Sequence, residues 1–308
     1  MHPAPPHHQH QHDEVVAVAE ECNIQDYCIA WNESLGFGVN GSVVRARHVH
    51  SKDEVAVKIL RDKPQHRNEV RMQQLCQQLG GHSVRIVATS TGFGYHPKGQ
   101  EYCRLLYVMM EVVEAAGAHT GDLFDLVKDC GRLEEHLCKQ VARSLAHTLN
   151  CMHGNNIIHG DVKLENVLVA GVTRNQIEVK LADFGFASEL PVRVGQSPPH
   201  TPGYASPEIV HALRGYQATG AGQEYGPEVD MWALGVLLYT LLAGTMPFSG
   251  LELSDKLQRQ ILIGRPAYTR SIWRDMPGAE RVVRGLLDRD PLTRLTAAQL
   301  LGDDWLLA

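Results

Sequence analysis

The chain has 308 residues, a formal net charge of −6 at pH 7 and a hydrophobic fraction of 44%. This length suits one two-lobed unit or two small domains, and the composition supplies enough apolar side chains for a buried core. The negative charge argues against a general nucleic-acid-binding or anionic-membrane-binding surface. The longest apolar run, near residues 234–244, is too short to span a bilayer, and no apolar signal core stands at the start.

The seven cysteines are scattered, odd in number, and form no Cys-x-x-Cys pair. This spacing disfavours both a structural zinc site and a disulfide framework. A reducing, intracellular setting therefore fits best. We expect the cytoplasm, with the nucleus as the alternative compartment.

Residues 1–22 form a His-, Pro- and Gln-rich segment with too little apolar surface to order itself. We expect a solvated tail there, although clustered histidines can also bind divalent metal. Short apolar runs between glycines then predict strands, most clearly over 42–47 and 54–60. Pro64 at one end and Gly80-Gly81 at the other delimit a predicted helix over 64–79.

Strands resume at 85–91 and 102–112, and helical patterns dominate after about residue 121. The longest predicted helices cover 133–153, 230–243 and 278–288. The order predicts an α+β protein with one folded unit over 27–305. Its parts would be a small strand-rich lobe with one main helix (27–111), a hinge (111–114) and a larger helical lobe (115–305).

Two short segments in the middle of the chain carry the most informative chemistry. Residues 159–166, His-Gly-Asp-Val-Lys-Leu-Glu-Asn, supply Asp161, Lys163 and Asn166, and Asp183-Phe184-Gly185 supplies a second carboxylate. Magnesium prefers oxygen ligands and keeps part of its water. Two carboxylates, a lysine and an amide can therefore hold magnesium against a triphosphate and orient a hydroxyl toward it.

A glycine-rich segment precedes the strand at 42–47, with Leu35, Gly36, Gly38 and Gly41 at its key positions. Glycine lets backbone N–H groups approach phosphate oxygens because no Cβ stands in the way. Alone, the pattern also fits a dinucleotide fold or an ordinary hairpin. A strand rather than a helix follows at Val43. This favours a glycine-rich hairpin that covers the phosphates of a nucleotide, in preference to a dinucleotide-binding turn.

Lys58 lies on the next predicted strand, where it is a candidate for gripping phosphates. Such a lysine needs a carboxylate to orient it. Between Lys58 and Glu101 the only acidic residues are Asp62 and Glu69. Asp62 is too close in sequence, so elimination nominates Glu69, on the predicted helix, as the ion-pair partner.

Taken together, this ordered set resembles the glycine-rich loop, His-Arg-Asp catalytic loop and Asp-Phe-Gly motif of protein kinases. The resemblance covers about residues 27–305. It is greatest to the MAP-kinase-activated group of the calcium/calmodulin-dependent kinase superfamily. It implies a two-lobed protein-kinase-like fold that uses ATP and Mg²⁺.

The resemblance also implies roles for individual residues. Asp161 would orient the substrate hydroxyl, Lys163 would neutralise the transferred phosphoryl group, and Lys58 would hold the α- and β-phosphates. Asn166 and Asp183 would bind magnesium. The adenine pocket would be lined by Val43, Ala56 and Leu168, with Met110 as gatekeeper and backbone hydrogen bonds from Glu111 and Val113.

Further positions concern the peptide substrate. Asp122 and Glu165 match family positions that meet basic residues upstream of the acceptor, although both could be ordinary surface acids. Thr201 matches a structural threonine that hydrogen-bonds the catalytic Asp and Lys, while its Thr-Pro dipeptide also suits a phosphorylation site. The resemblance further implies that Glu208 pairs with Arg294 and that Asp230 braces the catalytic loop.

One residue departs from the pattern. Gly160 stands where most relatives have an arginine that pairs with a phosphate on the activation segment. A phosphate on the candidate site Ser197 would lose that partner, although Arg193, Lys180 or a histidine could replace it. We therefore expect an activation segment that is ordered by something other than an arginine-held phosphate.

The most complete interpretation is an active, Mg-ATP-dependent serine/threonine protein kinase. Lys163 favours Ser/Thr over Tyr acceptors, and we expect a monomer whose partners are protein substrates, with no nucleic acid or membrane. An inactive or weakly active kinase-fold scaffold is the alternative. A small-molecule kinase is a third interpretation, against which the Ala205-Ser206-Pro207-Glu208 docking segment argues.

Overall fold

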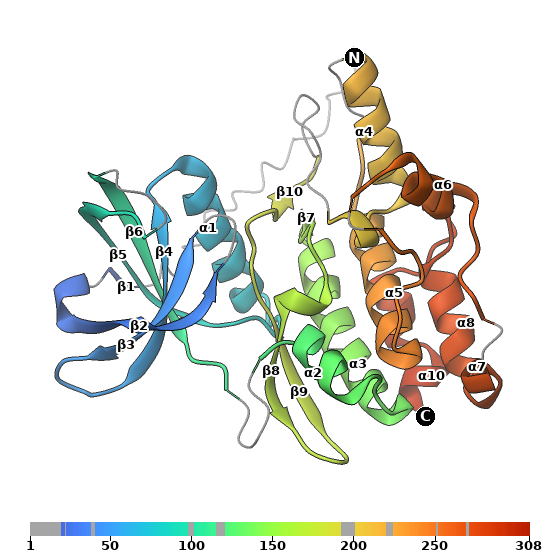
Figure 1. Cartoon of the computed structure of the whole chain (residues 1–308), viewed down its shortest axis with the longest axis horizontal. Helices are drawn as coiled ribbons and strands as arrows, with labels where there is room; N and C mark the ends of the chain where they lie inside the picture. Colours follow the sequence, from blue (N-terminus) through green and yellow to red (C-terminus); the bar gives the residue numbers. More distant parts are fainter. Residues whose placement is uncertain are drawn as a thin grey trace, which may run out of the picture.

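The computed structural model describes residues 20–21, 23–37, 41–97, 102–114, 121–191, 201–219, 224–250, 252–268 and 271–308. Figure 1 shows a strand-rich lobe formed by the first third of the chain beside a larger helical lobe. This arrangement confirms the two-lobed α+β fold expected from the sequence. Among the described residues, no helix combines the length and apolar character needed to cross a bilayer.

The small lobe is built on a six-stranded sheet in the order β1-β5-β6-β4-β3-β2. Neighbouring strands are antiparallel except for the β1–β5 pair. Side chains alternate between the two faces, and both faces bury apolar clusters. The elements are β1 Glu20–Glu21, the short helix η1 Ile24–Asp26, β2 Tyr27–Phe37, β3 Ser42–His48, β4 Glu54–Arg61, β5 Ile86–Tyr95 and β6 Tyr102–Glu111.

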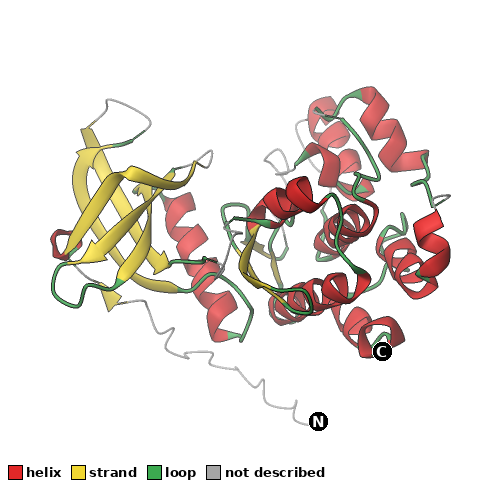
Figure 2. Ribbon diagram, turned by 60° about the horizontal axis from the view of Figure 1, so that its bottom comes forward, coloured by secondary structure: helices red, strands yellow, loops and turns green. Residues whose placement is uncertain are grey.

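One helix, α1 (Pro64–Gln78), lies beside this sheet on the side of the helical lobe (Figure 2). Proline suits its first turn, where the backbone N–H has no helical partner. After the helix, Gly80 takes a positive φ of 81° and turns the chain. The next segment joins the helical lobe, because Val84 N donates to Leu181 O and Leu181 N donates to His82 O, each at 2.9 Å.

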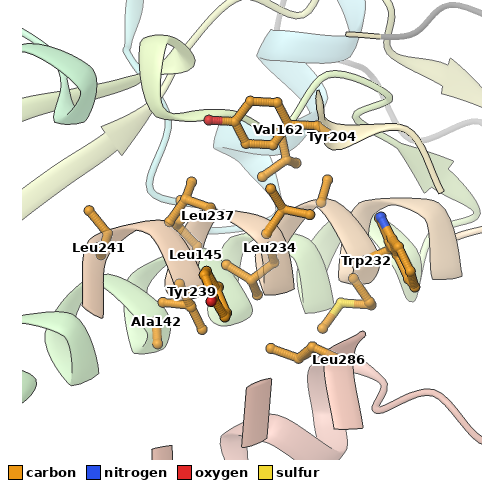
Figure 3. Close-up of a cluster of buried hydrophobic side chains, with 14 of the residues drawn as sticks. Ala142, Leu145, Val162, Tyr204, Trp232, Leu234, Leu237, Tyr239, Leu241 and Leu286 are labelled. Atoms are coloured by element: carbon orange, nitrogen blue, oxygen red, sulfur yellow. The ribbon is translucent and has the colours of Figure 1, made fainter. Parts of the chain in front are cut away.

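The helical lobe is centred on α5 (Glu228–Ala243), which is buried from Val229 to its end. Figure 3 shows residues of α5 packed against α3 (Glu135–His153). The other elements are α2 Leu123–Cys130, β7 Ile157–Ile158, η2 Leu164–Asn166, β8 Val167–Val172, β9 Ile177–Leu181, β10 Ser188–Glu189, η3 Pro202–Tyr204, α4 Pro207–Thr219, α6 Asp255–Ile263, α7 Ser271–Asp275, α8 Pro277–Leu286, α9 Ala297–Leu301 and α10 Asp304–Leu307.

The structure departs from the sequence expectations at a few boundaries. β5 continues to Tyr95, beyond the expected end at residue 91, because pairing with β6 holds its two glycines, Gly92 and Gly94, in the ladder. β1 lies inside the segment expected to be a tail and pairs with Ala88 and Thr89. Residues 1–19 and 22 of that segment lie outside the described residues.

Arg294 is a buried cation that ties the lobe together. Its guanidinium lies 2.7 Å from Glu208 Oε1, which confirms the expected pair. It also donates to the carbonyls of Asp288 and Glu228 and lies over the Trp232 ring. Removing one partner of such a pair leaves the other charge without compensation.

We therefore predict that Arg294→Met lowers the free energy of unfolding by about 3 to 5 kcal/mol. Arg281→Met is the matched control, because Arg281 pairs with Asp303 at an exposed site and should contribute about 1 kcal/mol or less. Denaturant unfolding of both variants measures the difference. Equal losses would contradict the prediction.

Gly160 follows β7 in the left-handed region, with φ of 76°. A Cβ built there would stand 2.9 Å from Phe186 O. The glycine therefore does more than omit a side chain. It permits a backbone conformation and a close approach that other residues reach only with strain.

We predict that Gly160→Ala destabilises the protein by roughly 1 to 2 kcal/mol, the cost of a left-handed non-glycine residue. Gly171→Ala is the control, since a Cβ there meets nothing within 4 Å. Thermal and denaturant unfolding of the two variants provide the comparison. A Gly160→Ala protein as stable as the control would show that the loop relaxes freely.

Candidate active site

Three charged side chains from separate elements meet between the lobes. Lys58 on β4 places Nζ 2.5 Å from Glu69 Oε1 on α1 and 3.0 Å from Asp183 Oδ1. Glu69 is buried, whereas Asp183 is 41% exposed. The structure therefore brings together the three residues that the sequence nominated for phosphate and metal binding.

The electrostatics of the site favour the charged forms of Lys58 and Asp183. Burial alone would lower the pKa of Lys58, but the charges of Glu69 and Asp183 outweigh burial and raise the pKa. Burial would likewise raise the pKa of Asp183, but the Lys58 charge and hydrogen bond lower it. Both directions favour the ionised forms at neutral pH.

The backbone after β9 is anchored by Phe184. Its fully buried ring packs in a cluster with Met72 and Cys76 of α1 and meets the His159 ring edge-on, with centroids 4.9 Å apart. Asp183 itself has a positive φ of 56°. Packing of Phe184 therefore fixes the position from which Asp183 reaches Lys58.

A second network surrounds Asp161, which is buried just after β7. Lys163 Nζ donates to Asp161 Oδ2 at 2.6 Å, and Thr201 Oγ1 donates to Asp161 Oδ1 at 2.5 Å. Asn166 Nδ2 donates to both the backbone and the side chain of Asp161. Thr201 is thus hydrogen-bonded to both Asp161 and Lys163.

The backbone of this loop rests on Asp230 of α5. The carboxylate accepts hydrogen bonds from His159 N at 2.8 Å and Gly160 N at 2.9 Å, and it pairs with His153. These contacts confirm the expected bracing. Burial would raise the pKa of Asp230, but the His153 hydrogen bond and nearby charges lower it, so the carboxylate stays ionised.

An apolar cluster adjoins the triad and contains the residues expected to line an adenine pocket. It buries Ala56 and Met110, and Val43, Val113 and Leu168 pack against it. These residues come from both lobes, since Leu168 belongs to β8. The cluster therefore supplies an apolar surface beside the charged groups.

Glu111 makes contacts that the sequence did not suggest. Its backbone N–H donates to Arg85 O at 2.9 Å, so an adenine contact there would have to use the carbonyl oxygen. Its carboxylate pairs with Lys180 at 2.8 Å. The pair engages the Lys180 ammonium group at the hinge.

The described residues of the glycine-rich segment lie at the end of β2 and directly before β3. Gly36 pairs with Val43, Leu35 is 41% exposed, and a Cβ on Gly41 would stand 2.5 Å from Ile59 O. Gly41 is thus required for close packing against β4. Gly38 lies outside the described residues, as do Ser197 and Arg193.

Acidic side chains lie near the catalytic loop on the helical lobe. Asp122 caps α2 by accepting from Asp125 N at 3.0 Å, while Glu165 is exposed on η2. Burial raises the pKa of Asp122, and the charges of Asp125 and Glu165 add to that rise. A cation bound here would relieve this repulsion between carboxylates.

Two contacts between α1 and the start of the activation segment were also missed by sequence reasoning. Asn68 Nδ2 donates to Ala187 O at 3.2 Å, and Arg71 pairs with Glu189 at 2.7 Å. Both join residues about 120 positions apart in sequence. No local pattern signals such pairs, although Asn68 precedes Glu69 directly.

Asn166 and Asp183 each have a side-chain oxygen that could bind magnesium. Both side-chain hydrogen bonds of Asn166 use its Nδ2 nitrogen, and within the described residues no donor reaches its side-chain oxygen. Asp183 Oδ1 meets Lys58 and Gly185 N, and no donor among the described residues reaches Oδ2. Two free oxygens suit magnesium that keeps water and phosphate ligands. The described residues hold no cluster of three or more His, Cys, Asp or Glu for a fully protein-bound metal.

Comparison with known proteins agrees with this geometry. Residues 29–306 match the model of the protein kinase domain. The chain is 31% identical to human MAP kinase-activated protein kinase 5 over 305 residues, which cover 94% of the chain and 62% of that protein. It is 30% identical to human MAP kinase-activated protein kinase 2 over 291 residues, covering 92% and 67%.

The chain thus spans less than two thirds of the length of human MAP kinase-activated protein kinase 5. The resemblance to the MAP-kinase-activated group that the sequence motifs indicated is confirmed. The matched region contains both lobes and every charged group described above. The chain belongs to the protein kinase family.

Proposed function

We propose that this chain is an active serine/threonine protein kinase that transfers the γ-phosphate of Mg-ATP to hydroxyls of protein substrates. The observation that carries the proposal is the simultaneous assembly of two networks, Lys58–Glu69–Asp183 and Asp161–Lys163–Thr201. Phosphoryl transfer is catalysed mainly by positioning and electrostatic stabilisation, so the arrangement of these charges is the decisive feature.

Each residue has a defined task in this proposal. Lys58, oriented by Glu69, binds the α- and β-phosphates. Asp161 accepts a hydrogen bond from the substrate hydroxyl and orients it, while Lys163 offsets negative charge on the transferred group. Magnesium held by Asn166 and Asp183 would supply further charge neutralisation. The apolar cluster around Ala56 and Met110 would bind the adenine ring.

Thr201 holds Asp161 and Lys163 in place through its hydroxyl. This contact supports a structural role in preference to a phosphorylation site, because a phosphate there would displace both partners. The contacts of Asn68 and Arg71 with the start of the activation segment support ordering without an arginine at position 160. We propose that these contacts replace the missing arginine–phosphate pair.

Radiolabelled ATP with a basic Ser-containing peptide tests the activity. We expect Asp183→Ala to lower kcat/KM by at least about a hundredfold, which corresponds to roughly 2.7 kcal/mol. Chelation of magnesium should abolish transfer by the wild type. Unfolding curves of both proteins serve as the control for folding. Equal transfer by wild type and Asp183→Ala, or none by either, would favour a scaffold without catalysis.

We also propose a preference for arginine a few residues before the acceptor. Asp122 and Glu165 would bind it by charge-assisted hydrogen bonds, and their mutual repulsion favours a bound cation. Asp122 also caps α2 by accepting a hydrogen bond from Asp125 N, so it would have to bind arginine while keeping this cap.

The expected result is that Glu165→Gln reduces the advantage of an arginine-containing peptide over its alanine counterpart by about tenfold in kcat/KM. Activity toward the alanine peptide should stay unchanged, which separates lost recognition from lost catalysis. Glu178→Gln, an exposed acid on β9, is the matched control. A positional library that shows no basic preference in the wild type would rule the proposal out.

A further inference from the structure

Three aromatic side chains gather at the end of the β5–β6 hairpin. Figure 1 shows β5 and β6, and this end is the opposite end of β6 from the hinge. Phe93, Tyr95 and Tyr102 are 68%, 67% and 61% exposed. The Phe93 and Tyr102 rings stack with centroids 6.2 Å apart, and Tyr95 meets Tyr102 edge-on at 5.3 Å. A contiguous exposed aromatic surface of this kind marks an interaction site.

Within the described residues, the strand that carries two of these rings has an unpaired outer edge beyond Ser90. β1 pairs only with Ala88 and Thr89, and Ile24 N donates to the Ser90 side chain. Beyond that point, no strand in the described part of the chain pairs with β5 over residues 91–95. Edge strands are usually protected by lysine, proline or a bulge, and the sequence Thr-Gly-Phe-Gly-Tyr has neither lysine nor proline.

The alternation of glycine and aromatic residues gives this edge two different faces. Phe93 and Tyr95 project on one face, together with Tyr102 of β6. Gly92 and Gly94 lie on the other, where a Cβ would already contact Tyr107 and Leu105 at 3.6 and 3.2 Å. If another strand pairs with β5, the side chains that it places on the aromatic face can therefore contact the exposed rings.

The aromatic face is also positively charged. Arg104 lies opposite Phe93 and contacts Asp62 at 3.0 Å, and Arg67 pairs with the same carboxylate at 2.6 Å. The arginines are 55% and 56% exposed, but the Asp62 side chain is only 4% exposed. Lys63 beside it is exposed as well. Cationic groups therefore reach solvent while their carboxylate lies beneath them.

We propose that the edge of β5 and this aromatic face bind an extended segment of another protein, which adds a strand to the sheet. Main-chain hydrogen bonds would supply affinity and side chains on one face would supply specificity. Because residues two apart share a face, the segment carries apolar and acidic side chains at alternating positions i and i+2. This binding is independent of phosphoryl transfer.

A labelled nonapeptide of pattern Thr-Glu-Thr-Phe-Thr-Glu-Thr-Phe-Thr is the probe, measured by fluorescence anisotropy. Two control peptides replace Glu by Lys, or the central Thr by Pro, which removes a strand N–H. We expect binding of the first peptide alone, with a dissociation constant below about 1 mM. No binding by the wild type, or equal binding of all three peptides, overturns the proposal.

Variants locate the site. The double variant Phe93→Ser/Tyr102→Ser and the single variant Arg104→Gln should each weaken binding by about tenfold or more, a shift readily resolved in a dissociation constant. Trp31→Ser, also 61% exposed but on β2, and Arg47→Gln on β3 are the matched controls. Unchanged binding in the double variant contradicts the proposal.

Two further readouts separate the alternatives. Transfer to a short peptide should be equal in all these variants, so loss of probe binding cannot be confused with loss of catalysis. Light scattering reports self-association. A dimer that the double variant abolishes would assign the edge to a second copy of the chain and would overturn the proposed occupant.

Discussion

The contact on which the active geometry depends is the ion pair between Lys58 and Glu69, extended to Asp183. It joins three elements that no continuous stretch of backbone holds together: a central strand, the one helix of the small lobe and the segment after β9. Lys58 and Glu69 carry opposite charges at a buried site and must pair, because either charge alone would be left without compensation for its loss of water. Forming the Lys58–Glu69–Asp183 contact therefore requires both the observed position of α1 and the observed alignment of the two lobes.

A second requirement of the same kind operates below the cleft. Asp230 lies on α5, which is buried from Val229 to its end, and its carboxylate accepts hydrogen bonds from backbone N–H groups of the loop that carries Asp161. A helix that is apolar on nearly every side thus supplies one carboxylate as the acceptor for two backbone N–H donors of the loop. The rigid core of the large lobe sets the position of the reactive loop directly.

Much of this could be predicted from the sequence because the informative residues are few and their order is fixed. Lys58 and Glu69 could be paired by elimination, since the intervening segment offers only one other acid. The Glu111–Lys180 pair could not, because its partners are 69 residues apart and neither stands in a distinctive motif. The extension of β5 was missed for a related reason. Glycine signals a turn locally, and only the ladder with β6 overrides that signal.

The backbone bonds that join His82 and Val84 to Leu181 have a mechanical consequence. They attach the segment after α1 to the large lobe, although the sheet on either side belongs to the small one. The end of α1 near Gln78 is therefore tied to the large lobe, while its beginning at Pro64 follows directly from β4 of the small lobe. Glu69 lies between these two attachments, so the carboxylate that pairs with Lys58 is positioned by both lobes at once.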